Sequence, residues 1–404
     1  MKRPVLLIVI LFLLVGCNHQ VKEAPAQGWK AGVAGVKITP PQNIWMAGYA
    51  SRDHAAEDMQ HDLWAKALAL EDSLGNRAVL ITADVLGFPK DMSDRIRKQL
   101  YEKLNLTEAQ IILNGSHTHS GPVLPNALVD IYLFDDAEKE KIQKYASFLE
   151  KLVVDLAVEA FRMAEPVRIF AGNGAARFQV NRRNNSEKSL VEQTELKGPN
   201  DYAVPVFKLV SLSGALKAVA FGYACHPTVL SGYSWCGDYP GFAQIDLEEK
   251  YPGAIAMFFQ GAGADQNPLP RRSIPLAKQY GLTLSAAVER VLDEPMRLLP
   301  AILSTAYMEV DLPLTPAPSE AELEKVVAGS DVAYHKRWAE RLLSGVRSGN
   351  MPLTSYPYPL QVWNVGGQPV MTLGGELVIE YAIGLKKMFG QDIFVMGYCN
   401  DLMA

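Results

Sequence analysis

Short apolar runs and apolar stripes alternate along the chain from Gly32 onward, with no long linker between them. Apolar runs bounded by polar residues predict buried strands, and apolar residues spaced by three or four predict amphipathic helices. The predicted strands are 78–84, 110–114, 167–170, 204–210, 218–223, 254–259, 360–364, 369–373 and 393–397. The predicted helices are 91–104, 136–163, 276–293 and 377–389, with 319–344 as two helices or one interrupted by Gly329.

Two of these helices have a clear apolar face. The predicted inward residues are Met92, Ile96, Leu100 and Leu104 in the first, and Ile142, Phe148, Leu149, Leu152, Val153 and Leu156 in the second. Strands that alternate with helices are typical of α/β proteins. We therefore expect layered mixed β-sheets flanked by helices in a single large domain, 28–404. The strands after 360 are expected to complete the same sheet, and 319–344 to form an inserted lobe.

The first 27 residues follow another pattern. Met1-Lys2-Arg3 is basic, and the apolar run that follows ends at Val15, too short for a bilayer that needs about 20 residues. This predicts a secretory signal, 1–16. The small residues before Cys17 resemble the lipobox of bacterial lipoproteins, which makes Cys17 the expected lipid anchor and 17–27 a polar tether; an ordinary export signal is the alternative. Asn18 suggests outer-membrane sorting, so we expect a lipid-anchored protein of the cell envelope.

The composition is that of a globular protein with a sizeable core, at 49% hydrophobic and 21% charged residues. The formal net charge is −5, and no basic stripe predicts nucleic-acid binding. After export three cysteines remain, Cys225, Cys236 and Cys399, which allow at most one disulfide. Cys225 and Cys236 are the closer pair in sequence, but spacing does not decide the connectivity.

Candidate chemistry begins with Ser116-His117-Thr118-His119-Ser120-Gly121-Pro122, directly after the strand 110–114. The chain has only seven histidines, and two of them stand here one residue apart. Both can point to one side of an extended segment and share a metal, or one can bind metal while the other moves protons. Alternatively, both are satisfied by hydrogen bonds in a turn.

Two further segments follow predicted strands in the same way. His226 precedes Pro227, which fixes the neighbouring backbone, although a turn in the core would explain this pair equally well. Glu376 follows paired glycines before a predicted helix, where an acidic residue is favoured by the helix dipole alone. Together His117, His226 and Glu376 form the ligand set of catalytic zinc sites that leave one position for water.

A Gly-rich stretch, 259–268, also follows a predicted strand. It lacks the Lys-Ser/Thr of a phosphate-binding loop, so a nucleotide site is disfavoured. Its backbone amides or Asn267 can approach a substrate, or the stretch is a plain turn. The polar cluster 181–185 is either a second binding element or a solvated loop. The predicted substrate contacts are Asn181, Gly263 and Asp265.

These segments together resemble one family, the neutral, non-lysosomal ceramidases. The motifs that carry the resemblance follow the family's order: Ile38-Thr39-Pro40, Met46-Ala47-Gly48-Tyr49-Ala50, SHTHSGP at His117, ACHPT at His226, Gly237-Asp238-Tyr239-Pro240-Gly241, the 265–268 turn and GGE at Glu376. SHTHSGP is the most specific of them.

The resemblance implies hydrolysis of an N-acyl bond at a single catalytic zinc (Zn²⁺) held by His117, His226 and Glu376. It implies that His119 lies beside the metal without binding it, and that Arg182 contacts the reacting group. Zinc would lower the pKa of bound water from 15.7 to about 7 and polarise the amide carbonyl. We assign to His119 the proton that reaches the departing amine.

Two departures from the family pattern stand out. The family has a serine where this chain has Asn267, which cannot be a nucleophile and would at most orient water or an oxyanion. In the family a tyrosine shortly beyond the counterpart of Asn400 completes the metal shell, and an immunoglobulin-like domain follows. Because this sequence stops at Ala404, we expect an open shell, a substitution by Tyr398, or a shortened gene product.

Three hypotheses follow. The first is a zinc-dependent amidase that acts on an N-acyl lipid or a similar amide and meets the membrane through its lipid anchor. The second is another zinc hydrolase, acting on an ester or a non-lipid amide. The third is a non-catalytic envelope protein that keeps the shape of the site without turnover.

Overall fold

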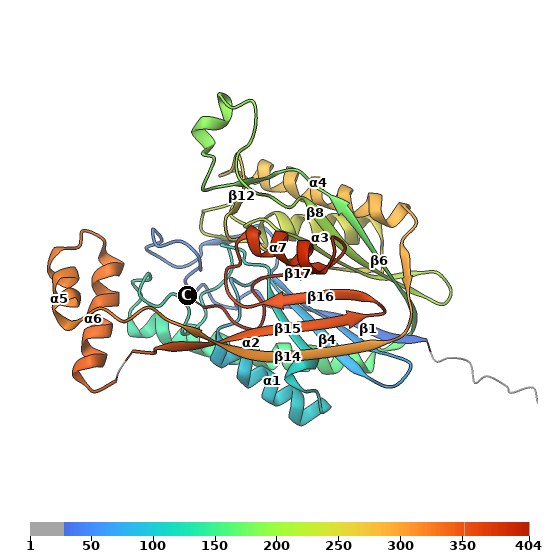
Figure 1. Cartoon of the computed structure of the whole chain (residues 1–404), viewed down its shortest axis with the longest axis horizontal. Coiled ribbons are helices and arrows are strands. Elements are labelled where there is room, and N and C mark those ends of the chain that lie inside the picture. The colour runs from blue at the N-terminus through green and yellow to red at the C-terminus, as the bar shows by residue number, and fades with distance from the viewer. Residues whose placement is uncertain (1–27, 351, 404) are drawn as a thin grey trace, which may run out of the picture.

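The computed structural model describes residues 28–350 and 352–403. The predicted signal, Cys17 and the tether therefore lie outside the described residues. A nine-stranded sheet forms the centre of the molecule (Figure 1). In spatial order its strands are β11 (Ile255–Gln260), β9 (Leu216–Tyr223), β8 (Ala203–Ser211), β6 (Glu165–Ala175), β1 (Trp29–Lys37), β3 (Trp64–Glu71), β4 (Arg77–Ala83) and β5 (Ile111–Gly115), with β13 (Arg297–Leu299) paired to β6.

A second sheet has four strands and lies in front of the large sheet in Figure 1. Its order is β14 (Leu303–Pro313), β15 (Ser355–Val365), β16 (Gln368–Leu373) and β17 (Phe394–Met396). The expectation that the C-terminal strands complete the first sheet is therefore wrong. Two short ribbons pair β2 (Asp58–Met59) with β10 (Ser234–Trp235), and β7 (Gln179–Asn181) with β12 (Gln266–Pro268).

Seven α-helices lie in the described part of the chain. They are α1 (Lys90–Leu104), α2 (Asp136–Arg162), α3 (Asp238–Lys250), α4 (Ile274–Asp293), α5 (Glu320–Gly329), α6 (Ala333–Arg347) and α7 (Ile379–Phe389). Helices α1 and α2 share one apolar core with β3 and β4, whereas α3 and α4 share another with β8, β9 and β11. A third core joins the opposite face of the large sheet to the small sheet, as Leu68 and Phe259 cluster with Trp363 and Phe394. The predicted α/β fold of layered mixed sheets and helices is confirmed.

Local patterns predicted most helices well. Met92, Ile96 and Leu100 are buried on α1, and the two-helix alternative for 319–344 is confirmed by α5 and α6. Phe148 was expected to face inward on α2 but is 43% exposed, because it lies beyond the edge of the buried stripe. Helix α3 and strands β1, β3 and β14 were not predicted.

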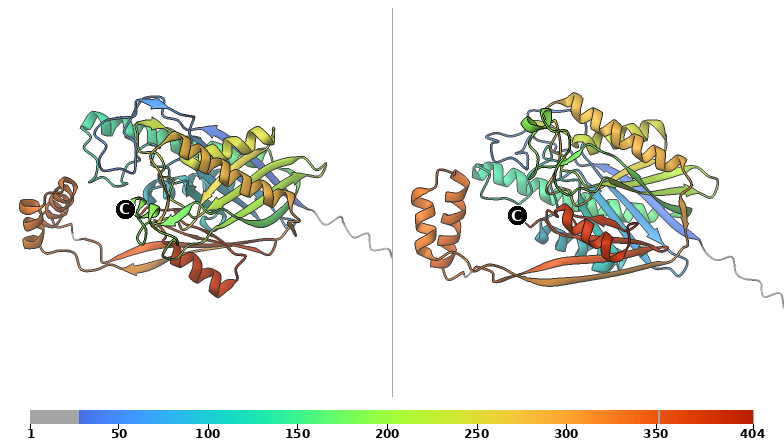
Figure 2. Two further views of the ribbon diagram at one scale, coloured as in Figure 1. Left: turned by 90° about the horizontal axis from the view of Figure 1, so that it is seen from above. Right: turned by 45° about the horizontal axis from the view of Figure 1, so that its top comes forward.

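The lobe formed by α5 and α6 projects from the end of β14 and β15, away from the layered body, in both views of Figure 2. The sequence allowed at most one disulfide and left the pairing open; in the structure Cys225, Cys236 and Cys399 are all buried free thiols. No helix in the described part of the chain has the length and apolar character needed to cross a membrane.

Candidate metal centre and active site

The large sheet brings its two edge strands together, and this creates the site. Strands β5 and β11 are at opposite ends of the strand order, yet the Gln260 N–H on β11 donates to Asn114 Oδ1 on β5 at 2.8 Å. Asn114 Nδ2 donates in turn to the carbonyl of Gly397, just after β17, at 2.8 Å. The buried side-chain amide of Asn114 therefore connects three strands that are distant in the sequence. Asn114 precedes His117 by three residues.

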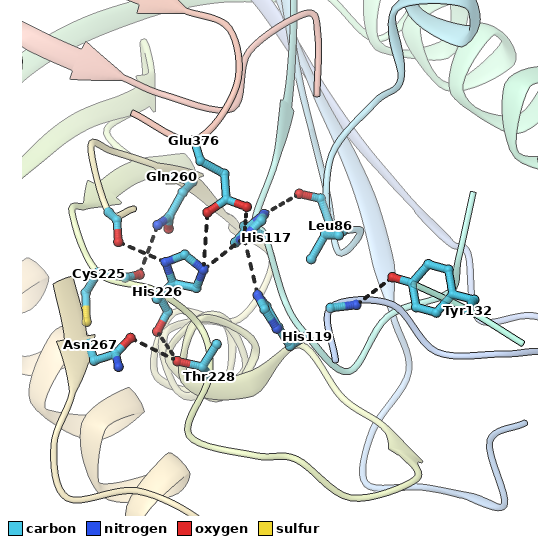
Figure 3. A network of polar contacts seen from close by, with 12 residues as sticks. Leu86, His117, His119, Tyr132, Cys225, His226, Thr228, Gln260, Asn267 and Glu376 are labelled. Carbon is cyan, nitrogen blue, oxygen red and sulfur yellow. Dashed lines mark hydrogen bonds and ion pairs between the residues drawn. The ribbon is translucent and has the colours of Figure 1, made fainter. Parts of the chain in front are cut away.

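His117, His226 and Glu376 all follow strand ends, as predicted, and the structure brings them together (Figure 3). His117 Nε2 lies 3.0 Å from His226 Nε2. The two oxygens of Glu376 lie 3.6 Å and 3.7 Å from these same two nitrogens. Glu376 precedes α7 by three residues, so the alternative of an acidic residue in a helix's first turn is wrong.

The backbone fixes which nitrogen of each ring carries the proton. His117 Nδ1 lies 2.6 Å from the carbonyl of Leu86, and His226 Nδ1 lies 2.9 Å from the carbonyl of Gly263. A carbonyl only accepts hydrogen bonds, so both Nδ1 atoms carry the proton and both Nε2 atoms present lone pairs.

Two lone pairs facing each other at 3.0 Å form no hydrogen bond and repel unless a cation lies between them. Nitrogens bound 2.0–2.1 Å from a tetrahedral zinc are separated by roughly 3.3 Å, close to the observed distance. The carboxylate of Glu376 adds the negative charge that a divalent cation attracts. The residues present therefore fit a zinc ion.

His119 lies beside this pair but is held differently. Its Nε2 is 3.3 Å from His117 Nε2, so the three imidazoles form one compact buried group. Its Nδ1 is buried and has no hydrogen-bond partner in the described structure, in contrast to the other two rings. Its ring packs against Tyr49 with a centroid distance of 4.8 Å.

Gly48 explains how His119 fits so closely. The residue has φ of +96°, and a Cβ built there would lie 2.3 Å from His119 Nδ1. Only glycine tolerates both the backbone conformation and this approach. The Gly48 N–H donates to the Tyr132 hydroxyl at 2.9 Å, which holds the segment in place.

Electrostatics keeps the imidazoles neutral. Burial lowers the pKa of His117 below its usual value, and lowers the pKa values of His119 and His226 well below theirs. Neighbouring imidazoles and the positive charge of Arg182 act in the same direction on His119 and His226. Neutral imidazole is the form that binds metals, so the site is prepared for a cation.

The remaining predicted residues surround the cluster. Asp265 is buried and links the end of β7 to the start of α7: one oxygen accepts from Asn181 Nδ2 at 3.0 Å, and the other accepts from the N–H of Ile379 at 2.9 Å. Arg182 is exposed and its N–H donates to the Asp265 carbonyl at 2.8 Å. Asn267 is buried, with Oδ1 3.5 Å from the Thr228 hydroxyl. The substrate roles of Asn181, Gly263 and Asp265 stay predictions.

The supporting roles of Leu86 and Asn114 were not predicted from the sequence. Tyr49 stood in one of the family motifs without an assigned role, and Tyr398 was one alternative for the metal shell. Tyr398 is fully buried, its ring centroid is 4.3 Å from that of His117, and its hydroxyl has no hydrogen-bond partner among the described residues. Its φ of +56° is rare for a tyrosine. No sequence signal marks Leu86, because it acts through its carbonyl; the polar Asn114 inside an apolar run was the available clue for that residue.

Comparisons with known proteins agree with this architecture. The sequence profile described as "Neutral/alkaline non-lysosomal ceramidase, N-terminal" matches residues 29–265, which is more than half of the chain and includes His117, His119 and His226. The protein thus falls in the class of mixed α/β proteins with a strand-end histidine centre. It belongs to the neutral/alkaline non-lysosomal ceramidase family.

Individual relatives are distant. Neutral ceramidase A of Dictyostelium discoideum is 26% identical over 304 residues, covering 67% of this chain and 42% of that protein. Neutral ceramidase of Pseudomonas aeruginosa is 23% identical over 274 residues, covering 63% of this chain and 40% of the relative. The chain thus spans about two fifths of these relatives. The crystal structure of the Pseudomonas aeruginosa neutral ceramidase superposes with a TM-score of 0.71 at 18% identity, over 93% of this chain and 68% of that one.

Proposed function

We propose that this protein is a zinc-dependent hydrolase that cleaves the amide bond of an N-acyl compound. Its relatives are named neutral ceramidases, which makes ceramide the first compound to consider. The observation that carries the proposal is the pair of deprotonated Nε2 atoms of His117 and His226, 3.0 Å apart, with the Glu376 carboxylate facing both. Family membership supports the same reaction class. Ester or non-lipid amide hydrolysis at the same centre is the second candidate, since zinc would serve either.

In this proposal His117, His226 and Glu376 hold the metal. When bound, zinc would supply Lewis-acid polarisation of the amide carbonyl and lower the pKa of a water molecule toward about 7. Tyr398, whose buried hydroxyl has no other partner in the described structure, would add its oxygen to the shell. Burial raises the pKa of Tyr398 well above its usual value, so without a cation the hydroxyl stays protonated.

His119 would move protons during the reaction. Its neutral ring can accept a proton at one nitrogen and deliver it to the departing amine, because no carbonyl holds its Nδ1. Gly48 and Tyr49 would fix the position of the ring. Arg182 and Asn267 would stabilise negative charge on the carbonyl oxygen and orient the attacking water, respectively.

Metal analysis tests the proposal without relying on turnover. The purified protein, gently prepared, is expected to contain one zinc per chain by inductively coupled plasma mass spectrometry. His117→Ala and His226→Ala are each expected to reduce zinc at least tenfold. His335→Ala is the matched control, because His335 is exposed on α6, outside the cluster.

Activity provides the second part of the test. The zinc-loaded protein should hydrolyse ceramide or a simpler N-acyl amide, and His117→Ala should be inactive. Zinc far below one per chain in the unmutated protein would reject the metal centre. Full zinc with turnover of esters only would favour the second candidate, and full zinc with no turnover of either class would favour a non-catalytic role.

A further inference from the structure

Two arginines that no motif singled out connect to the histidine cluster. Arg271 Nη1 donates to the Thr228 hydroxyl at 3.4 Å, two residues after His226. Arg272 Nη1 donates to the Tyr49 hydroxyl at 3.0 Å, and its guanidinium lies 5.2 Å from the centre of that ring. We call Arg271 and Arg272 the arginine pair. Each member is thus one side chain away from a site histidine.

The arginine pair forms no ion pair with a carboxylate in the described structure, whereas Arg95 and Arg341 do. Two carboxylates act on the pair electrostatically without forming an ion pair with either guanidinium: Glu187 on Arg271, and Asp238 on Arg272. Glu187 accepts a hydrogen bond from the backbone N–H of Arg271 at 3.3 Å. Asp238, whose pKa is raised by burial to about 6, accepts the N–H groups of Leu230 and Tyr239 at 2.9 Å and 2.7 Å.

Positive charge therefore accumulates on the solvent side of the cluster. Arg271 is half-buried and Arg272 is exposed, whereas the three histidines are buried. Arg182 adds a third guanidinium whose field reaches all three imidazoles. The field of Arg271 reaches His226 as well. A neutral lipid headgroup would gain little from such an arrangement, whereas an anion would gain a charge-assisted hydrogen bond to each guanidinium.

The backbone at Arg272 supports this interpretation. Arg272 has φ of +84°, a conformation that is strained for a side chain with a Cβ, and its N–H is fixed to the Val229 carbonyl at 2.7 Å. Glycine would be the unstrained choice at such a position. The strain is retained at the residue whose guanidinium packs on Tyr49, as is typical of functional positions.

We propose that the substrate carries an anionic group, a carboxylate or phosphate, on its amine portion, and that the arginine pair binds it. The inference deepens the proposed function and rests on it for the location of the amide. The amine side is assigned because Arg272 holds Tyr49, which packs on His119, the group proposed to protonate the departing nitrogen.

The experiment compares two amides that share an acyl chain and differ in the charge of the amine, N-lauroylglycine and N-lauroylethanolamine. With the zinc-loaded full chain, kcat/KM is expected to be at least tenfold higher for N-lauroylglycine. Arg271→Gln and Arg272→Gln should each lower this preference about fivefold to tenfold, through KM rather than kcat. Arg271→Lys and Arg272→Lys should restore part of it, and Arg168→Gln, on the exposed face of β6, should leave it unchanged.

Calorimetric binding separates this inference from the reaction itself. If neither amide is hydrolysed, the proposed function is decided by turnover of ceramide, and the inference is decided by affinity alone. Tighter binding of N-lauroylglycine by tenfold or more, weakened by salt and by either Gln variant, supports an anion site. Equal kcat/KM, or equal affinity in the absence of turnover, overturns it, as does a preference that both Gln variants retain.

Discussion

The histidine cluster and the α5–α6 lobe are assembled by contacts of very different range. The cluster joins positions 117, 119, 226 and 376, each at or after the end of a strand. The lobe is built within 320–347 around a small core of Leu323, Ala339 and Leu343. Its only ion pair to the layered body within the described residues is Arg341 with Asp130. Damage to the lobe should therefore remain local, whereas damage to strands far from His117 should reach the histidine cluster.

The largest expected effect is on turnover, at His119, the one histidine of the cluster whose Nδ1 has no partner in the described structure. His119→Gln should lower kcat by about 10²–10⁴-fold, because a positioned proton donor is lost. Zinc content should remain near one per chain, since His117 and His226 keep their backbone acceptors. Steady-state kinetics and metal analysis on the same preparation check this. Loss of zinc together with activity would instead make His119 a ligand.

A smaller effect on function is expected from loss of Asn114, whose side chain connects β5, β11 and the end of β17. Asn114→Ala leaves the Gln260 N–H buried without its acceptor and the Gly397 carbonyl with only the Cys399 thiol, at 3.2 Å, which should lower the free energy of unfolding by about 1–3 kcal/mol. Zinc affinity should fall too, because His117 follows three residues later. Urea unfolding and zinc titration measure both quantities. Asn364→Ala, at an exposed hairpin position, is the control and should cost less than about 1 kcal/mol. An unchanged zinc affinity would contradict the proposed coupling.

The smallest effect on function is expected in the lobe. Leu343→Ala removes one of three buried side chains there and should destabilise α5 and α6 locally by about 2 kcal/mol. Hydrogen exchange should rise in 320–347 only, with zinc content and kcat unchanged. An effect on either quantity would show that the lobe and the cluster are coupled, and the contrast between the two regions would be lost.

Sequence patterns determined the helices and strands whose formation depends mainly on residues close by in the chain. The stripe of Met92, Ile96 and Leu100 defined α1, and polar residues after apolar runs placed His117 and His226 at strand ends. Strands β1 and β3 were missed: β3 alternates Ala and Leu, which is weak as a strand signal. Helix α3 was missed because Pro240 and Gly241 lie within its first turns, where burial against α4 outweighs weak propensity.

Residue types alone indicated two imidazoles and a carboxylate, because those side chains are a recurrent zinc ligand set. Only the tertiary structure decided that they meet. Curvature of the large sheet brings β5 beside β11, a separate small sheet delivers Glu376, and carbonyls of Leu86 and Gly263 fix the tautomers. The arginine pair emerged in the same way, since its hydrogen bonds to Thr228 and Tyr49 join segments that are 43 and 223 residues apart. Such contacts depend on how the strands are ordered and connected in space, and the periodicity of apolar residues carries no information about that order.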